Sequence, residues 1–154
     1  MDIGNLTIAG RLFLAPLAGI SNYPFRSLAR KFGASFCYTE MISADAISRN
    51  QEKTIKMLDM APDEHPVGVQ LFGSSPEYIA KAAKAVEEFG PDLIDLNIGC
   101  PVRKVVKKNG GAALLKNLPL AGEIMAAAVE NCSIPVTIKT RTGWTKNSDT
   151  FLEL

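Results

Sequence analysis

Apolar residues alternate along this chain between two kinds of segment. Five short, nearly continuous apolar runs are separated by longer segments in which apolar residues recur at helical spacing. The runs lie at residues 11–15, 35–39, 67–72, 92–96 and 135–140. Strands buried on both faces have this appearance, and strand–helix alternation is typical of a parallel sheet covered by helices. The pattern therefore predicts a series of five βα units.

Caps, prolines and glycines mark where the intervening helices begin and end. Pro24 and Pro76 stand at first-turn positions that favour proline, and Gly33 and Gly90 stand where helices commonly end. We expect helices at residues 24–33, 43–49, 75–89 and 120–129, a short helical run up to Leu115, and a last helix that starts at Ser148. We also expect a small hairpin formed by residues 6–8 and 11–15, and a polar loop at residues 59–66.

Consecutive βα units fit two architectures, a doubly wound sheet and part of an eight-stranded (β/α)8 barrel of the TIM type. No Gly-x-Gly-x-x-Gly sequence follows the first strand, which counts against a dinucleotide-binding sheet. The chain has 154 residues, of which 47% are hydrophobic. That is enough for a single α/β domain with a buried core.

Composition also bears on the compartment. No apolar run is long enough to span a membrane, and the N-terminus lacks the basic and apolar blocks of a signal peptide. The three cysteines are widely spaced and form no Cys-x-x-Cys pair, which argues against a disulfide framework or a zinc site. We expect a cytoplasmic protein without a bound metal, in which Cys37 and Cys132 are apolar fillers.

Several polar side chains stand within or just after the C-terminal halves of the predicted strands. Parallel strands bring these ends to one edge of a sheet, so the side chains should meet there. They are Glu40, Gln70, Asn97, Cys100, Lys139 and Arg141. For Gln70, a satisfied buried amide and a ligand contact both remain open. For Lys139, the alternatives are a structural salt bridge and a polar or anionic ligand.

The fourth strand ends in Asn97-Ile98-Gly99-Cys100-Pro101. Pro101 cannot extend a sheet ladder, and Gly99 allows a ligand or backbone to approach closely. A cysteine alone is usually a structural thiol, but this setting at the end of a strand points to a functional one.

Charge is unevenly distributed despite a net charge of +1. Residues 34–99 carry 11 acidic and 5 basic side chains, whereas residues 100–146 carry 8 basic and 2 acidic ones. The basic block could be a solvated face or could face an anionic partner such as nucleic acid or phosphate.

Taken together, these motifs resemble the bacterial tRNA-dihydrouridine synthases, in particular the DusB-like subgroup. The resemblance rests on residues 15–19, Glu40-Met41, residues 70–73, residues 95–101 and residues 139–141, and it runs from the first strand to the last residue. Two departures are Leu17, where many members have Met, and Ser21-Asn22, where Thr-Asp is common. Neither departure removes a group that the chemistry requires.

The resemblance implies that residues 1–154 are the N-terminal part of an FMN-binding (β/α)8 barrel. The remaining barrel strands and a helical C-terminal domain would lie outside these residues. It also implies a set of flavin contacts made by Pro16, Leu17, Ala18, Gln70 and Lys139. The loops that would hold the flavin phosphate follow later strands, so these residues alone should bind FMN weakly and self-associate through exposed sheet edges.

The reaction implied by the resemblance is the reduction of the C5–C6 double bond of specific uridines in tRNA. FMN, reduced by NADPH, would supply a hydride to C6, and the thiol of Cys100 would supply the proton to C5. The implied substrate contacts are Asn97 toward the uracil and Arg141, Arg103 and Lys104 toward tRNA. Two alternatives are another FMN-dependent barrel oxidoreductase acting on a free pyrimidine or an enone, and an inactive barrel fragment.

Overall fold

The computed structural model describes all residues from Met1 to Leu154. Its centre is a five-stranded parallel sheet in which neighbouring strands follow one another in sequence, in the order β3-β4-β5-β6-β7. The strands are β3 (Phe13–Leu14), β4 (Phe36–Ser43), β5 (Val67–Phe72), β6 (Leu93–Ile98) and β7 (Val136–Thr140). A separate antiparallel hairpin, β1 (Asp2–Ile3) and β2 (Leu6–Thr7), precedes them.

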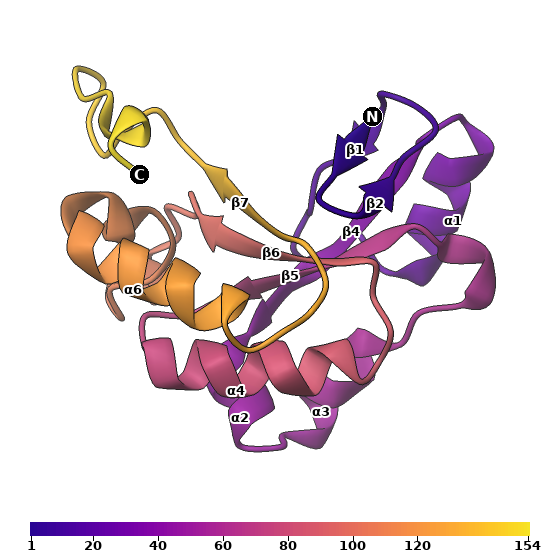
Figure 1. Cartoon of the computed structure of the whole chain (residues 1–154), viewed down its shortest axis with the longest axis horizontal. Helices are drawn as coiled ribbons and strands as arrows, with labels where there is room; N and C mark the ends of the chain where they lie inside the picture. The colour runs from indigo at the N-terminus through magenta and orange to yellow at the C-terminus, as the bar shows by residue number, and fades with distance from the viewer.

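Helices connect the strands and gather along one side of the sheet (Figure 1). The α-helices are α1 (Tyr23–Lys31), α2 (Ala44–Ser48), α3 (Glu52–Ile55), α4 (Pro76–Glu87), α5 (Arg103–Val106) and α6 (Leu118–Val129). Short 3-10 turns are η1 (Lys56–Leu58), η2 (Pro62–Glu64), η3 (Gly111–Lys116) and η4 (Thr150–Leu152). None of the helices combines the length and the apolar character needed to cross a membrane.

The main core lies between the sheet and these helices. It is a cluster of 18 buried residues, to which α4 contributes Ile79, Ala82, Ala83 and Val86 at helical spacing. Ser75 caps α4 by accepting a hydrogen bond from the Tyr78 amide, and Pro76 occupies its first turn. This burial fixes β5 and β6, the two strands that carry the polar side chains described below.

The sheet face opposite the core carries no helix of this chain (Figure 1). Its amino-terminal end belongs to a small apolar cluster of Ile8, Phe36 and Leu93, and polar side chains lie toward its carboxyl end. Register places Met41, Gln70, Asp95 and Thr137 in one row across β4, β5, β6 and β7. Asn97 and Lys139 form the next pair toward the carboxyl ends of the strands. Of the residues predicted to gather at one edge, the register places Gln70, Asn97 and Lys139 on neighbouring strands of this face. Arg141 lies at the same end of the strands, where it donates to the Gly99 carbonyl.

Four local features differ from the sequence predictions. The hairpin joins residues 2–3 to residues 6–7, because Gly4 takes a left-handed φ of 58° in the two-residue turn, and Phe13–Leu14 instead pairs in parallel with β4. Strand β4 continues to Ser43 through an irregularity between Tyr38 and Met41. The expected last helix is only the 3-10 turn η4, and the expected polar loop at 59–66 contains η2.

Residues 1–154 expressed alone should self-associate and bind FMN weakly. The outer strands β3 and β7 have free edges, and apolar side chains such as Leu12, Leu17 and Ile138 are exposed. Gel filtration and a flavin titration test this expectation. A folded monomer that retains stoichiometric FMN through purification would contradict it.

Candidate active site

The turn that follows β6 holds Cys100 through hydrogen bonds to its backbone. The amide oxygen of Asn97 accepts from the backbone N–H groups of Gly99 at 3.1 Å and Cys100 at 2.9 Å. Arg141 Nε donates to the Gly99 carbonyl at 2.6 Å, and the Ala112 amide donates to the Cys100 carbonyl at 3.0 Å. Every backbone donor and acceptor of Gly99 and Cys100 therefore has a partner, while Cys100 is partly exposed and forms no disulfide.

Gly111 supports the same turn from the other side. Its φ is +57°, and a Cβ atom at this position would lie 2.7 Å from the Cys100 carbonyl oxygen and 3.1 Å from the Cys100 Cβ. Both the backbone conformation and the space therefore require glycine. The sequence analysis noted no role for Gly111, although its place shortly after the Cys100 motif was a usable signal.

A chain of polar side chains continues from Asn97 into the sheet. Asn97 Nδ2 donates to Gln70 Oε1 at 2.9 Å, and Gln70 Nε2 donates to Asp95 Oδ2 at 2.6 Å. The other carboxylate oxygen of Asp95 accepts from Thr137 Oγ1 at 2.7 Å. Gln70 is thus a satisfied buried amide, 1% exposed, as one of the two alternatives foresaw.

Asp95 is the titratable residue that the sequence analysis missed. Its side chain is 2% exposed, and this burial raises the pKa of the carboxyl group. Hydrogen bonds from Gln70 and Thr137 and the charge of Lys139 act in the opposite direction and lower the pKa. An acidic residue in the middle of an apolar strand was the signal that could have revealed it.

Lys139 lies beside Asn97 in the register of β6 and β7. Its side chain is exposed and takes part in no salt bridge, so the structural ion pair considered from the sequence is not formed. β7 is an edge strand of the described sheet, which leaves this cation free to meet a polar or anionic ligand on the open face.

The loop between β3 and α1 carries Pro16, Leu17 and Ala18 and is tied down by two residues. The hydroxyl of the buried Ser21 accepts from the Leu17 amide at 3.0 Å and donates to the Leu17 carbonyl at 3.1 Å. The carboxylate of Glu40 accepts from the Gly19 amide. Glu40, expected at the end of its strand, thus positions the loop, while Leu17 and Ala18 stay exposed.

Basic side chains lie on the segment that follows the Cys100 turn. Arg103 and Lys104 lie on α5, and they and the following Lys107 and Lys108 are all exposed. The ammonium group of Lys116 lies 4.7 Å from the ring centre of Trp144, which links η3 to the segment after β7. The predicted basic block is therefore a solvent-facing surface near the cysteine.

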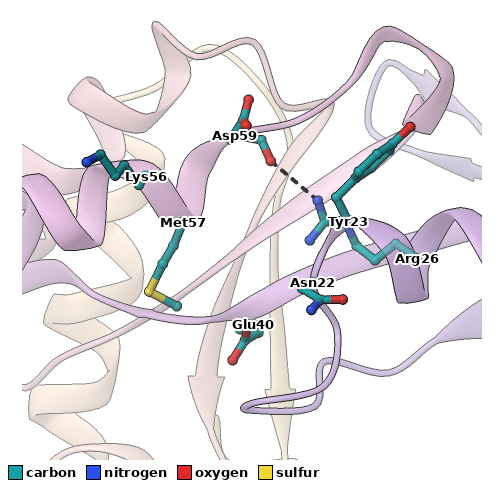
Figure 2. Close-up of a pocket in the computed structure, with 7 residues that line it drawn as sticks. All are labelled: Asn22, Tyr23, Arg26, Glu40, Lys56, Met57 and Asp59. Atoms are coloured by element: carbon teal, nitrogen blue, oxygen red, sulfur yellow. Dashed lines mark hydrogen bonds between the residues drawn. The ribbon is translucent and has the colours of Figure 1, made fainter.

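A separate pocket of about 190 Å³ lies between α1 and the α3–η1 segment (Figure 2). Arg26 in its wall donates to the Asp59 carbonyl at 3.4 Å. Lys56 points away from the other labelled side chains and pairs with Glu52 at 2.7 Å. Neither Cys100 nor Lys139 lines this pocket. Glu40, one of the residues predicted to meet at the edge of the sheet, lines this pocket, which is separate from the part of the edge that carries Cys100 and Lys139.

The curled parallel sheet, its outer helices and a cysteine turn at the carboxyl ends of the strands define the N-terminal part of a TIM-type (β/α)8 barrel. A solved structure of histamine dehydrogenase from Rhizobium sp. 4-9 has this fold, with a TM-score of 0.66 and 15% sequence identity over 92% of this chain and 31% of that one. A family profile described as "Dihydrouridine synthase (Dus)" matches residues 13–154. The chain belongs to the dihydrouridine synthase family.

Relatives with similar sequences support the same assignment. The chain is 40% identical over 146 residues to tRNA-dihydrouridine synthase B of Pseudomonas aeruginosa, covering 95% of this chain and 44% of that protein. It is 41% identical over 158 residues to a probable tRNA-dihydrouridine synthase of Rickettsia bellii, covering 100% of this chain and 48% of the relative. The chain therefore spans a little under half the length of these curated relatives.

Proposed function

We propose that this chain forms the cysteine-bearing part of the catalytic barrel of a tRNA-dihydrouridine synthase. The reaction is reduction of the C5–C6 double bond of specific uridines in tRNA, with FMN as cofactor and NADPH as reductant. The observation that carries the proposal is the fully hydrogen-bonded Cys100 turn beside the unpaired Lys139. The three free thiols suit a reducing cytoplasm, which we propose as the compartment.

The residues on the open face fit a flavin. An exposed cation at Lys139, the amide of Gln70 and the exposed loop at Pro16, Leu17 and Ala18 supply a charge, a hydrogen-bonding group and apolar contact. Gln70 keeps one N–H and one carbonyl lone pair beyond the bonds already described. When bound, a reduced flavin supplies the hydride for C6 of the uracil.

Cys100 is the proposed source of the proton for C5. Its thiol is partly exposed, and the turn that carries it is held at four backbone positions, which keeps the donor in one place. Asn97 would orient the uracil near this thiol. The target base must leave its stack to reach the site, so the protein would hold an extruded nucleotide.

The basic surface is proposed to bind tRNA phosphates. Arg103, Lys104 and Arg141 are exposed beside the cysteine turn. Contacts of this kind contribute affinity that falls steeply with salt and carry no sequence information.

Salt dependence separates this proposal from the main alternative, another FMN-dependent barrel oxidoreductase that reduces a free pyrimidine or an enone. For a complete synthase that carries these residues, the logarithm of the binding constant for tRNA should fall linearly with the logarithm of salt concentration. Turnover of a free pyrimidine or enone should be slow at every salt concentration. Salt-independent binding together with efficient turnover of the small substrate would favour the alternative.

Replacing Lys139 with Met should weaken FMN binding and lower the reduction potential of the bound flavin. The substitution keeps the aliphatic stem and removes the charge that would stabilise the reduced, anionic ring. Flavin titration and a potentiometric titration measure both effects. The control variant Lys104→Met, on α5, should leave the potential unchanged, and an unchanged potential in Lys139→Met would reject the flavin-facing role.

A further inference from the structure

One buried polar group on the open face has none of the roles described above. Asp95 is 2% exposed in the middle of β6 and accepts hydrogen bonds at both carboxylate oxygens. Gln70 is the donor on one side, at 2.6 Å, and Thr137 is the donor on the other, at 2.7 Å. Two donors that converge on one buried group require it to be an acceptor.

The hydrogen bonds from Asp95 toward Cys100 have a single consistent direction. The backbone amides of Gly99 and Cys100 are donors, so the Asn97 side chain must turn its oxygen toward them. Its nitrogen then faces Gln70, which must offer its oxygen. The Gln70 nitrogen is left facing Asp95, which completes the series as the final acceptor.

A carboxylate at the end of this series restricts which way round the amide side chains of Gln70 and Asn97 can lie. An amide side chain can rotate by half a turn and exchange its donor and acceptor, and two amides in series could do so together. An ionised Asp95 offers acceptors only, so a reversed Gln70 would place oxygen against oxygen. The carboxylate at one end and the two backbone amides at the other therefore fix both side chains between them.

We propose that Asp95 is a positioning residue that fixes, through Gln70 and Asn97, the backbone turn carrying Cys100. The effect of Asp95 on catalysis rests on the function proposed above. Its effect on the position of the Cys100 turn is independent of that function. The hydrogen-bond partners of the Asp95 side chain are Gln70 and Thr137, and Cys100 is not one of them.

Amide hydrogen exchange at Gly99 and Cys100, in the FMN-loaded complete synthase, measures how well the hydrogen bonds of the turn protect these two amides. Asp95→Asn keeps the size of the side chain but no longer forces the orientation of Gln70, and it should speed exchange at both amides by up to about tenfold. Thr137→Val is the matched control. It removes the other hydrogen bond to Asp95 and should leave both amides as protected as in the wild type.

A second test uses two substitutions that reverse the direction of the hydrogen bonds between residues 95 and 97. In Asn97→Asp, carboxylates at both ends compete for the single amide nitrogen of Gln70, so the midpoint of urea unfolding should fall. Adding Asp95→Asn should restore much of that midpoint, because Gln70 can then rotate and donate to residue 97 while accepting from residue 95. Additive effects of the two substitutions, or unchanged exchange in Asp95→Asn, would overturn the proposal.

Kinetics separate this inference from the proposed function. Asp95→Asn should slow reoxidation of the flavin by tRNA, by up to about 10²-fold if the thiol is displaced, and should slow reduction of the flavin by NADPH much less. Equal slowing of both steps would overturn the positioning role. If the exchange and unfolding results hold but the wild-type protein does not act on tRNA, the proposed function fails while the role of Asp95 in holding the turn stands.

Discussion

Replacing Cys100 with Ala in the complete synthase is expected to lower the rate of dihydrouridine formation by about 10²- to 10⁴-fold, the usual contribution of a general acid. The turn that holds this residue uses backbone groups and the side chains of Asn97 and Arg141, none of which the substitution removes. The variant should therefore fold, bind FMN and accept electrons from NADPH as the wild type does. Stopped-flow measurement of flavin reduction and of its reoxidation by tRNA distinguishes the two steps.

The matched control for this prediction is Cys132→Ala. Cys132 is a partly buried thiol that donates to the Ala128 carbonyl at 3.2 Å, away from the edge that carries Cys100. The control should form dihydrouridine at a rate close to that of the wild type. Nearly normal uridine reduction by Cys100→Ala would remove the residue from its role as proton donor.

Replacing Arg26 with Met should lower the free energy of unfolding by about 3–5 kcal/mol, because it leaves a buried carboxylate without its partner. Arg26 and Glu64 are 3% and 1% exposed and are joined by bonds of 2.5 and 3.1 Å. The pair connects α1 to η2, the turn that precedes β5. Arg26 also donates to the carbonyl of Ser21 at 2.8 Å, and the Ser21 hydroxyl holds Leu17 in the loop that carries residues 16–18.

Urea unfolding of the complete synthase measures the effect of Arg26→Met. The double variant Arg26→Met with Glu64→Leu should recover most of the loss, because well-packed apolar side chains often replace a buried ion pair at little cost. Lys81→Met, in an exposed pair with Glu77 on α4, should change stability little. A small effect of Arg26→Met would mean that water reaches Glu64 or that the surrounding segment rearranges.

The sequence predicted the order of the βα units and the edge at which the polar residues meet, because both follow from apolar periodicity and from the geometry of parallel strands. It left open how each polar side chain is used. For Gln70 the sequence left open a ligand contact and a satisfied amide, and only the strand register, which places Asp95 beside it, showed the hydrogen bonds that the amide already makes. Distances across strands are not encoded in any local pattern.

Arg141 illustrates the same limit. The sequence suggested a contact with tRNA, whereas the structure also shows its Nε holding the Gly99 carbonyl, a residue 42 positions earlier in the chain. The misplaced hairpin has a more local cause. Two adjacent apolar runs suggested strand pairing with each other, but Gly4 makes the tighter turn, and β3 gains a longer partner in β4.

The most direct test is to supply a complete synthase carrying these residues with NADPH and tRNA that lacks dihydrouridine, and to analyse the nucleosides by mass spectrometry. Dihydrouridine should appear at specific positions, with one NADPH oxidised for each one formed, and the Cys100→Ala variant should produce almost none. Unchanged tRNA uridines, together with rapid oxidation of NADPH in the presence of a free pyrimidine or an enone, would contradict the proposed function.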